Sequence, residues 1–420
     1  MTLDRRSLLG LGVAAGAAGL AGCAPGAATT PPGAARTPGT LAVTSAAASP
    51  TATASLTPTA SASPTGSPGE AAWGEPDVKL GPPIGDGSQA PAIGPQPFQR
   101  PITKLAKGEK PPQFVVFSWD GASGNEDAIL EYVKAAHAVN GTQTLFTSAL
   151  YFLPKSLRTE YQPPRRPAGD SDINYMSDPT VRRTIIDTAI AWTYGNEIGT
   201  HFCGHFQDPN GVPSWTTDDW EQEISQVYKL MTTWRTITGW TDIGPLPFDY
   251  TKELVGARTP LLAGRKTLLP AAKRHGWRYD SSGVRGRAAW PVKDDYGLYD
   301  LSMFSVPFRG SSIIPMDYNF LASQAKGDQE AGSAAERATW KAEHAATLRA
   351  ALKKCLNGNR APFVIGNHLS PWLGGIYQQN LLALMTEFGR TPQVQLVSFR
   401  WLCDWMDAQD PDVLAALQAS

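Results

Sequence analysis

Short apolar, β-favouring runs alternate with amphipathic segments over residues 113–409, and this alternation constrains the fold more than any other feature. The runs include QFVVF at 113–117, NEIGTH at 196–201 and PFVIGNH at 362–368. Seven or eight strand–helix units over roughly 300 residues predict an α/β fold, a (β/α) barrel that is incomplete or distorted. The alternative is an open doubly wound sheet. No GxGxxG motif follows an early strand, so the sequence does not indicate a dinucleotide-binding fold.

The N-terminal segment, residues 1–23, has the features of an export signal. Arg5 and Arg6 precede a short stretch of Gly, Ala and Leu that ends in LAGC at Cys23. The twin arginines favour the export route for folded proteins, and the stretch is too short and glycine-rich for a membrane span. The LAGC ending resembles a bacterial lipobox, which implies cleavage before Cys23 and a lipid on its thiol. The alternative is a plain signal peptide.

Residues 24–112 are predicted to form a linker. Between Ala24 and Gly69 the only charged residue is Arg36, and the stretch consists mainly of Ala, Pro, Thr, Ser and Gly. Such a segment cannot bury enough apolar surface to offset its chain entropy, so we expect a disordered tether. Residues 74–112 remain proline-rich but gain charge, and could drape over the domain. We place the domain at 113–409 and a C-terminal tail at 410–420.

Composition narrows the classes of partner. The net charge of −1 and pI near 6.6 argue against nucleic acid, which requires a basic surface. Besides Cys23 the chain has only Cys203, Cys355 and Cys403, too few for a disulfide framework. At most one pair could form, and buried thiols are expected. Among 13 tryptophans, Trp119 and Trp372 are candidates for stacking on sugar rings, because aromatic faces suit the apolar faces of sugars.

Polar side chains with catalytic chemistry follow the predicted strands. In a barrel, functional residues gather at the carboxyl ends of the strands. In chain order, the residues at these ends are Asp120, His201, His205, Arg258, Asp280 and His368. Three of the six histidines therefore fall at strand ends, whereas the other three lie in predicted helices.

His201 and His205 lie four residues apart in GTHFCGH, directly after a predicted strand. Two imidazoles and one carboxylate form a common three-residue metal site that leaves positions open for water and substrate. Asp120 is the natural third ligand, although an Asp-Gly pair on its own usually indicates a turn. Together the three residues predict a site for a divalent metal.

With these motifs in place, residues 113–406 resemble a polysaccharide deacetylase of carbohydrate esterase family four, the NodB-homology type. FSWDG takes the place of that family's Asp-Asp-Gly motif, and His201-x-x-x-His205 matches its second motif. Arg258-Thr259-Pro260 matches its Arg-x-Pro motif, and a strand ending in His368 matches its last. The YDSS stretch at 279–282 also resembles many members.

The resemblance implies a role for each matched residue. Asp120, His201 and His205 would bind zinc or a similar divalent ion, and His368 would be the general acid that protonates the departing amine. Arg258 and Asp280 would orient and tune the acid and the base. The structural alternatives are a surface salt bridge for Arg258, a turn or cap for Asp280 and a hydrogen-bonded structural histidine for His368.

Two positions depart from the family pattern. Trp119 occupies the place of the family's general base, and an indole cannot accept a proton from water. Another acid could reach the site from a loop, namely Glu126, Asp127, Asp294 or Asp295. Alternatively, hydrolysis could proceed without a base, or the protein could be inactive. Phe202 stands where many members have Ser or Thr, which weakens the expected hydrogen bonds of that loop.

Three functions remain open on the sequence alone. The first is a metal-dependent deacetylase that acts on acetamide or acetyl ester groups of a cell-envelope polysaccharide such as peptidoglycan. The second is a catalytically impaired, lipid-anchored glycan-binding protein of the same fold, which Trp119 favours. The third is a hydrolase of other C–N bonds. The signal and tether predict an exported protein, anchored through Cys23 to the outer face of the cytoplasmic membrane.

Overall fold

The structure is a computed structural model that describes residues 76, 78–124 and 128–420. The signal segment, Cys23, most of the predicted tether, and the two base candidates Glu126 and Asp127 lie outside the described residues. Among the helices of the described part, none is long and apolar enough to cross a membrane.

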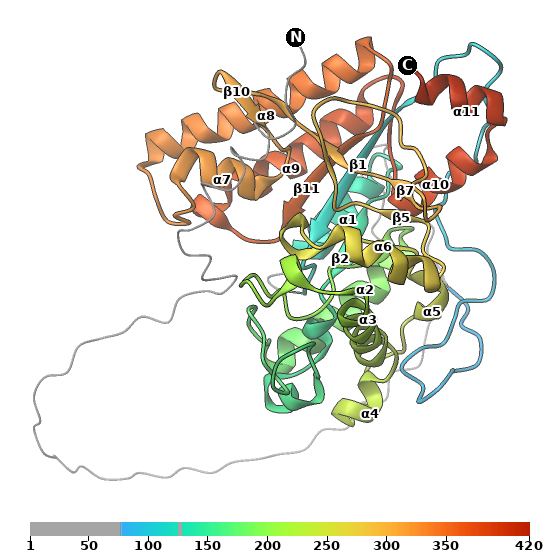
Figure 1. Cartoon of the computed structure of the whole chain (residues 1–420), viewed down its shortest axis with the longest axis vertical. Helices are drawn as coiled ribbons and strands as arrows, with labels where there is room; N and C mark the ends of the chain where they lie inside the picture. Colours follow the sequence, from blue (N-terminus) through green and yellow to red (C-terminus); the bar gives the residue numbers. More distant parts are fainter. Residues whose placement is uncertain (1–75, 77, 125–127) are drawn as a thin grey trace, which may run out of the picture. The chain divides into compact units, whose positions relative to one another are not determined.

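One parallel sheet of eight strands organises the domain. Its order is β11-β1-β2-β3-β4-β5-β7, and β12 pairs with the start of β1, beside β11. In Figure 1, β1 is drawn in cyan alongside β11 in orange. Within the described residues no ladder joins β7 to β11, so the barrel is incomplete, as the sequence predicts. The strands of the sheet are β1 Gln113–Asp120, β2 Thr144–Thr147, β3 Glu197–Thr200, β4 Gly256–Ala257, β5 Tyr279–Asp280, β7 Tyr299–Asp300, β11 Phe363–His368 and β12 Val394–Leu396.

Helices follow most strands of this sheet, as expected for βα units. The α-helices are α1 Ala128–His137, α2 Asp178–Thr193, α3 Thr217–Thr232, α4 Trp234–Thr238, α5 Tyr250–Glu253, α6 Arg265–Arg274, α7 Asp317–Ala325, α8 Ala334–Asn357, α9 Trp372–Arg390, α10 Phe399–Ala408 and α11 Pro411–Gln418. The short 3-10 helices within the described residues are η2 Ala149–Phe152, η3 Lys155–Glu160, η4 Val212–Ser214 and η5 Pro260–Leu262. Two small ribbons pair β6 Val284–Arg285 with β8 Met303–Phe304, and β9 Val306–Phe308 with β10 Ser311–Ile313.

The two faces of the sheet bury different sets of side chains. On β1, Val115, Phe117 and Trp119 join the cluster that contains side chains of α1 and α9. Phe114 and Val116 join a second cluster with residues from β2, β5 and α10, and we call this side the inner face. Successive residues of a strand point to opposite faces, so Asp120 falls on the inner face and Trp119 on the outer.

The described part of the predicted linker packs against the domain. In residues 78–112, Ser88, Gln89 and Ala90 are buried, and Gln89 forms a bridge with Leu246. The ordered domain therefore includes residues well before 113, because this segment buries polar and apolar groups that an extended tether would expose. The predicted tail at 410–420 forms helix α11. Cys203, Cys355 and Cys403 are free and buried, which confirms the expectation of buried thiols.

Trp119 is expected to contribute strongly to stability. It is fully buried, packs against the tilted ring of Tyr132 with ring centroids 3.8 Å apart and donates from Nε1 to Gln143 Oε1 at 2.7 Å. Trp119→Ala should lower the free energy of unfolding by about 3–5 kcal/mol in urea denaturation. Ile186→Ala, at a side chain that is 41% exposed, should cost about 0.5 kcal/mol or less. Equal losses in the two variants would contradict a core role for Trp119.

Candidate functional site

The carboxyl ends of the parallel strands meet at one edge of the sheet. Asp120, the last residue of β1, pairs in register with His368, the last residue of β11. Thr200 of β3 pairs with Ala257 of β4, so the residues that follow them, His201 and Arg258, leave the sheet at the same level. The register therefore brings together residues that are up to 248 positions apart.

A buried ion pair lies at the centre of this edge. Arg258 Nη1 donates to Asp120 Oδ1 at 2.8 Å, and the two side chains are 0% and 3% exposed. Ser281 fixes the rest of the guanidinium, because Nη2 donates to its hydroxyl at 2.9 Å and Nε to its carbonyl at 3.2 Å. Arg258 is therefore not a surface salt-bridge residue; in this structure its guanidinium holds the Asp120 carboxylate.

Gly366 on β11 makes room for this pair. A Cβ added there would lie 2.6 Å from Met316 Cε and 3.2 Å from Arg258 Nη1. The absence of a side chain at position 366 thus leaves room for the guanidinium to reach Asp120. Ser281 lies in the YDSS stretch, but neither Ser281 nor Gly366 was predicted from the sequence to contribute to the site.

His201 and His205 lie side by side and are held neutral. Their ring centroids are 5.3 Å apart. Burial lowers the pKa of His201 to about 3. Burial also lowers the pKa of His205 to about 3, with the positive form of His201 adding to the effect. His201 Nδ1 lies 2.8 Å from the carbonyl oxygen of Arg258, which can only accept, so the proton is on Nδ1 and Nε2 carries a lone pair.

This donor set fits a divalent metal in its chemistry, since metals bind neutral imidazole and a hydrogen bond from the second ring nitrogen fixes the tautomer. Asp120 is close enough for its charge to act on the pKa of His205. Within the part of the chain that the structure describes, however, no group of three or more His, Cys, Asp or Glu side chains is arranged to hold a metal. The two imidazoles are in place, and a third ligand is not set at binding distance.

The surroundings of His368 favour its protonated form, in contrast to those of His201 and His205. Its Nδ1 lies 2.8 Å from Asp317 Oδ1, and its backbone N–H donates to Asp317 Oδ2 at 2.7 Å. Burial alone would lower the pKa of His368, but the Asp317 carboxylate, with help from Asp120, outweighs burial and raises the pKa above the ordinary value. Asp317 begins helix α7, 51 residues before His368, and no local sequence motif connects the two.

The predicted role of Asp280 needs correction. Tyr279 faces inward, so Asp280 faces the outer helices, where it accepts from Arg265 of α6 at 2.5 Å. Its other oxygen accepts from the Ser282 hydroxyl at 2.7 Å. No hydrogen bond or ion pair in the described structure joins Asp280 to Arg258 or His368. Asp317 instead supplies the carboxylate that orients His368.

Trp119 does not stand at the site, because it faces the outer helices and is fully buried. The prediction that Trp119 stacks on a sugar ring is therefore wrong, because the side chain packs in the core. Neither loop acid that the structure describes takes the place of the missing base: Asp294 lies 3.7 Å from Arg265 in the Asp280 cluster, and Asp295 is exposed beside it. Among the described residues, Asp120 is thus the one carboxylate that pairs with Arg258.

Trp372 lies next to His368, with ring centroids 5.1 Å apart, and also contacts Tyr318 at 5.8 Å. It is only 5% exposed, so it lines the wall behind His368.

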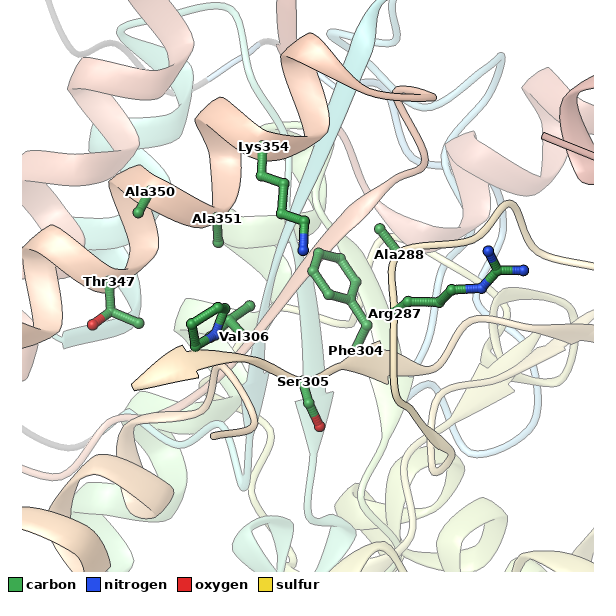
Figure 2. Close-up of a pocket in the computed structure, with 10 residues that line it drawn as sticks. Arg287, Ala288, Phe304, Ser305, Val306, Thr347, Ala350, Ala351 and Lys354 are labelled. Atoms are coloured by element: carbon green, nitrogen blue, oxygen red, sulfur yellow. The ribbon is translucent and has the colours of Figure 1, made fainter. Parts of the chain in front are cut away.

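A separate cavity of about 270 Å³ lies between α8 and the segment around β8 and β9 (Figure 2). Its lining is apolar except at Arg287, Ser305, Thr347 and Lys354, and it includes no acid or histidine.

No family model matches this sequence, and no curated protein matches it either. Among solved structures, a candidate polysaccharide deacetylase of Mycobacterium smegmatis aligns at 12% identity and TM-score 0.43, over 72% of this chain and 94% of that one. A CE4 esterase of Streptococcus mutans aligns at 12% identity and TM-score 0.37, over 68% and 86%. A CE4-family pseudoenzyme of Bacillus anthracis aligns at 7% and 0.36, over 74% and 72%. At identities and TM-scores this low, no residue role is transferred from these structures to this chain.

The Asp317–His368 pair makes stability depend on pH. Because the pKa of His368 is raised in the folded state, the pair stabilises the fold below the usual imidazole value, and this contribution is lost as pH rises through the folded pKa. Asp317→Asn should lower the pKa of His368 in an NMR titration. It should also cost about 1–3 kcal/mol of unfolding free energy, with a larger loss at about pH 5.5 than at about pH 8.5.

Asp249→Asn is the matched control, since Asp249 caps helix α5 away from His368. It should leave the His368 titration unchanged. An unchanged His368 pKa in Asp317→Asn would refute the assignment of Asp317 as the orienting carboxylate.

Proposed function

We propose that this protein is a hydrolase that removes acetyl groups from a cell-envelope polysaccharide with the help of a divalent metal, most simply zinc. The observation that carries the proposal is that three histidines at one edge of the sheet have pKa values shifted in opposite directions. His201 and His205 are held neutral, as metal ligands must be, while His368 is held ready to carry a proton. Environments that push the pKa values of neighbouring groups apart are typical of acid–base sites.

In this proposal, His201, His205 and Asp120 hold the metal. A divalent ion bound there supplies a Lewis acid that polarises an acetyl carbonyl and lowers the pKa of water. The resident side chains do the proton transfer. With Nδ1 bound to Asp317, protonated His368 has Nε2–H available to protonate the departing amine or alkoxide. Asp317 stabilises the imidazolium that donates this proton.

Asp120 could serve in either of two ways. Its Oδ1 accepts from Arg258, which leaves Oδ2 to be directed at a metal or at a water molecule. As a metal ligand it completes the three-residue set; as a proton acceptor it would take the role that Trp119 cannot fill. Asp120→Asn distinguishes the two, because loss of a ligand weakens metal binding whereas loss of a base lowers turnover with metal affinity retained.

The central test is release of acetate from acetylated chitooligosaccharide and from peptidoglycan by zinc-loaded full-length protein. His201→Ala should abolish stoichiometric zinc binding and acetate release together. His368→Ala should retain zinc and lower kcat by about 10²–10⁴-fold, as expected when a general acid is removed. His275→Ala is the control, since His275 pairs with Glu221 away from the strand ends and should change neither measurement. Stoichiometric zinc without hydrolysis of any acetylated substrate would contradict the enzymatic proposal.

A specific observation also favours a second function. The described residues include no three-ligand group arranged for metal, and the position of Trp119 offers no base. Both features fit a catalytically impaired protein that binds glycan at the same edge. Glycan binding measured by calorimetry, with no zinc uptake and no acetate release, would support this function over the first.

We further propose that the protein is exported and anchored by a lipid on Cys23. The proposal rests on the LAGC sequence and the twin arginines that precede it. Cys23→Ala should move the protein from the membrane fraction to the soluble extracytoplasmic fraction of the producing cell. Ala24→Ser, which keeps the thiol, serves as the control and should remain with the membrane. Equal fractionation of Cys23→Ala and wild type would refute the anchor.

A further inference from the structure

The loop from His201 to His205, which we call the histidine loop, has a backbone that its own sequence does not favour. Phe202 and His205 adopt left-handed conformations with φ of 62° and 56°. Such φ values are uncommon for residues other than glycine and persist only where the surroundings hold them. The loop must nevertheless keep its two imidazoles side by side. Something outside the loop therefore fixes its shape.

Helix α3 supplies two contacts from one face. Trp220 and Glu223 are three residues apart, so they project from the same side of the helix. The Trp220 ring packs on Phe202 with centroids 4.6 Å apart. Glu223 Oε1 accepts from the backbone N–H groups of Cys203 at 3.0 Å and Gly204 at 3.2 Å. The same helix thus packs against the side chain of one loop residue and accepts hydrogen bonds from the backbone of the next two.

Tyr161, at the end of η3, contacts both Glu223 and the histidine loop. Its hydroxyl donates to Glu223 Oε2 at 2.7 Å and accepts from Gly204 N–H at 3.1 Å. Tyr161 and Glu223 are both 0% exposed. No Lys, Arg or His of the described structure forms an ion pair with Glu223, so this buried carboxylate is satisfied mainly by the loop backbone and the tyrosine. A buried charge without a cation is costly, which indicates a specific use.

We propose that Glu223 and Tyr161 are positioning residues that hold the histidine loop in the shape that keeps the imidazoles of His201 and His205 side by side. They take the place of any side-chain hydroxyl within the loop, since Phe202 follows His201 and offers none. The inference rests on the proposed function for the role of the imidazoles, but its geometric part concerns only the loop. Neither residue touches the reacting atoms; both act through the backbone between the two histidines.

The test compares zinc affinity in Glu223→Ala, Glu223→Gln and Tyr161→Phe, by competition with a chelating indicator at about pH 8. This pH lies above the pKa of Glu223, which burial raises to about 7. Glu223→Ala should bind zinc about 10–100-fold more weakly, as is typical when a partner behind the ligands is lost. The two conservative variants should show smaller losses, because each keeps part of the hydrogen-bond network.

Two control variants separate positioning from general destabilisation. Glu253→Gln alters a buried carboxylate that pairs with Arg400, far from the loop in the chain. Tyr132→Phe removes a buried hydroxyl that has no hydrogen-bond partner among the described residues. Both should retain wild-type zinc affinity. If they lose as much affinity as the Glu223 and Tyr161 variants, the proposal is wrong.

Hydrogen–deuterium exchange provides a readout that does not depend on metal or activity. In the metal-free protein, the peptide covering residues 201–207 should exchange faster in Glu223→Ala and Tyr161→Phe than in wild type, with other segments unchanged. If wild-type protein binds no zinc, the proposed function fails and exchange alone decides the positioning role. Unchanged exchange at 201–207 in both variants would overturn it, whatever the hydrolysis assays show.

Discussion

The ion pair between Arg258 and Asp120 is the interaction on which the site depends. It joins the end of β1 to the residue after β4, and Ser281, after β5, holds the remaining guanidinium donors. Removing two charges from water is expensive, so a buried pair of this kind is weak evidence for stability. Its value is explained by geometry: the pair fixes the Asp120 carboxylate, whose charge acts on the pKa values of His205 and His368.

Strand alternation explains which of the predicted residues reach this pair. On β1 the inner face carries Phe114, Val116 and then Asp120, whereas Trp119 faces the helices. On β5 the inner residue is Tyr279, so Asp280 points outward to Arg265. A shift of one residue along a strand moves a side chain to the other face of the sheet. A motif aligned by letters alone therefore does not determine which side chain enters a site.

The sequence was sufficient for the architecture and for the residues at the strand ends, because strand and helix periodicities differ and parallel strands end at one edge. It could not provide Asp317, whose link to His368 spans 51 residues and has no local pattern. It allowed residues 74–112 to drape over the domain but could not predict which of them pack there, since proline-rich composition resembles that of a tether. The sequence could not show which face of the sheet Asp280 points to, because a strand of two residues has no alternating pattern of apolar and polar residues.

The three strand-end histidines show how one sheet edge can support two protonation states. His201 is buried and His205 and His368 are partly buried, and burial favours neutral imidazole in each. His201 meets a carbonyl oxygen, which fixes its tautomer but adds no full charge, so it stays neutral. His368 meets the Asp317 carboxylate, whose full negative charge outweighs the cost of desolvation. The main difference between the two imidazoles is thus the partner of Nδ1, a carbonyl for His201 and a carboxylate for His368.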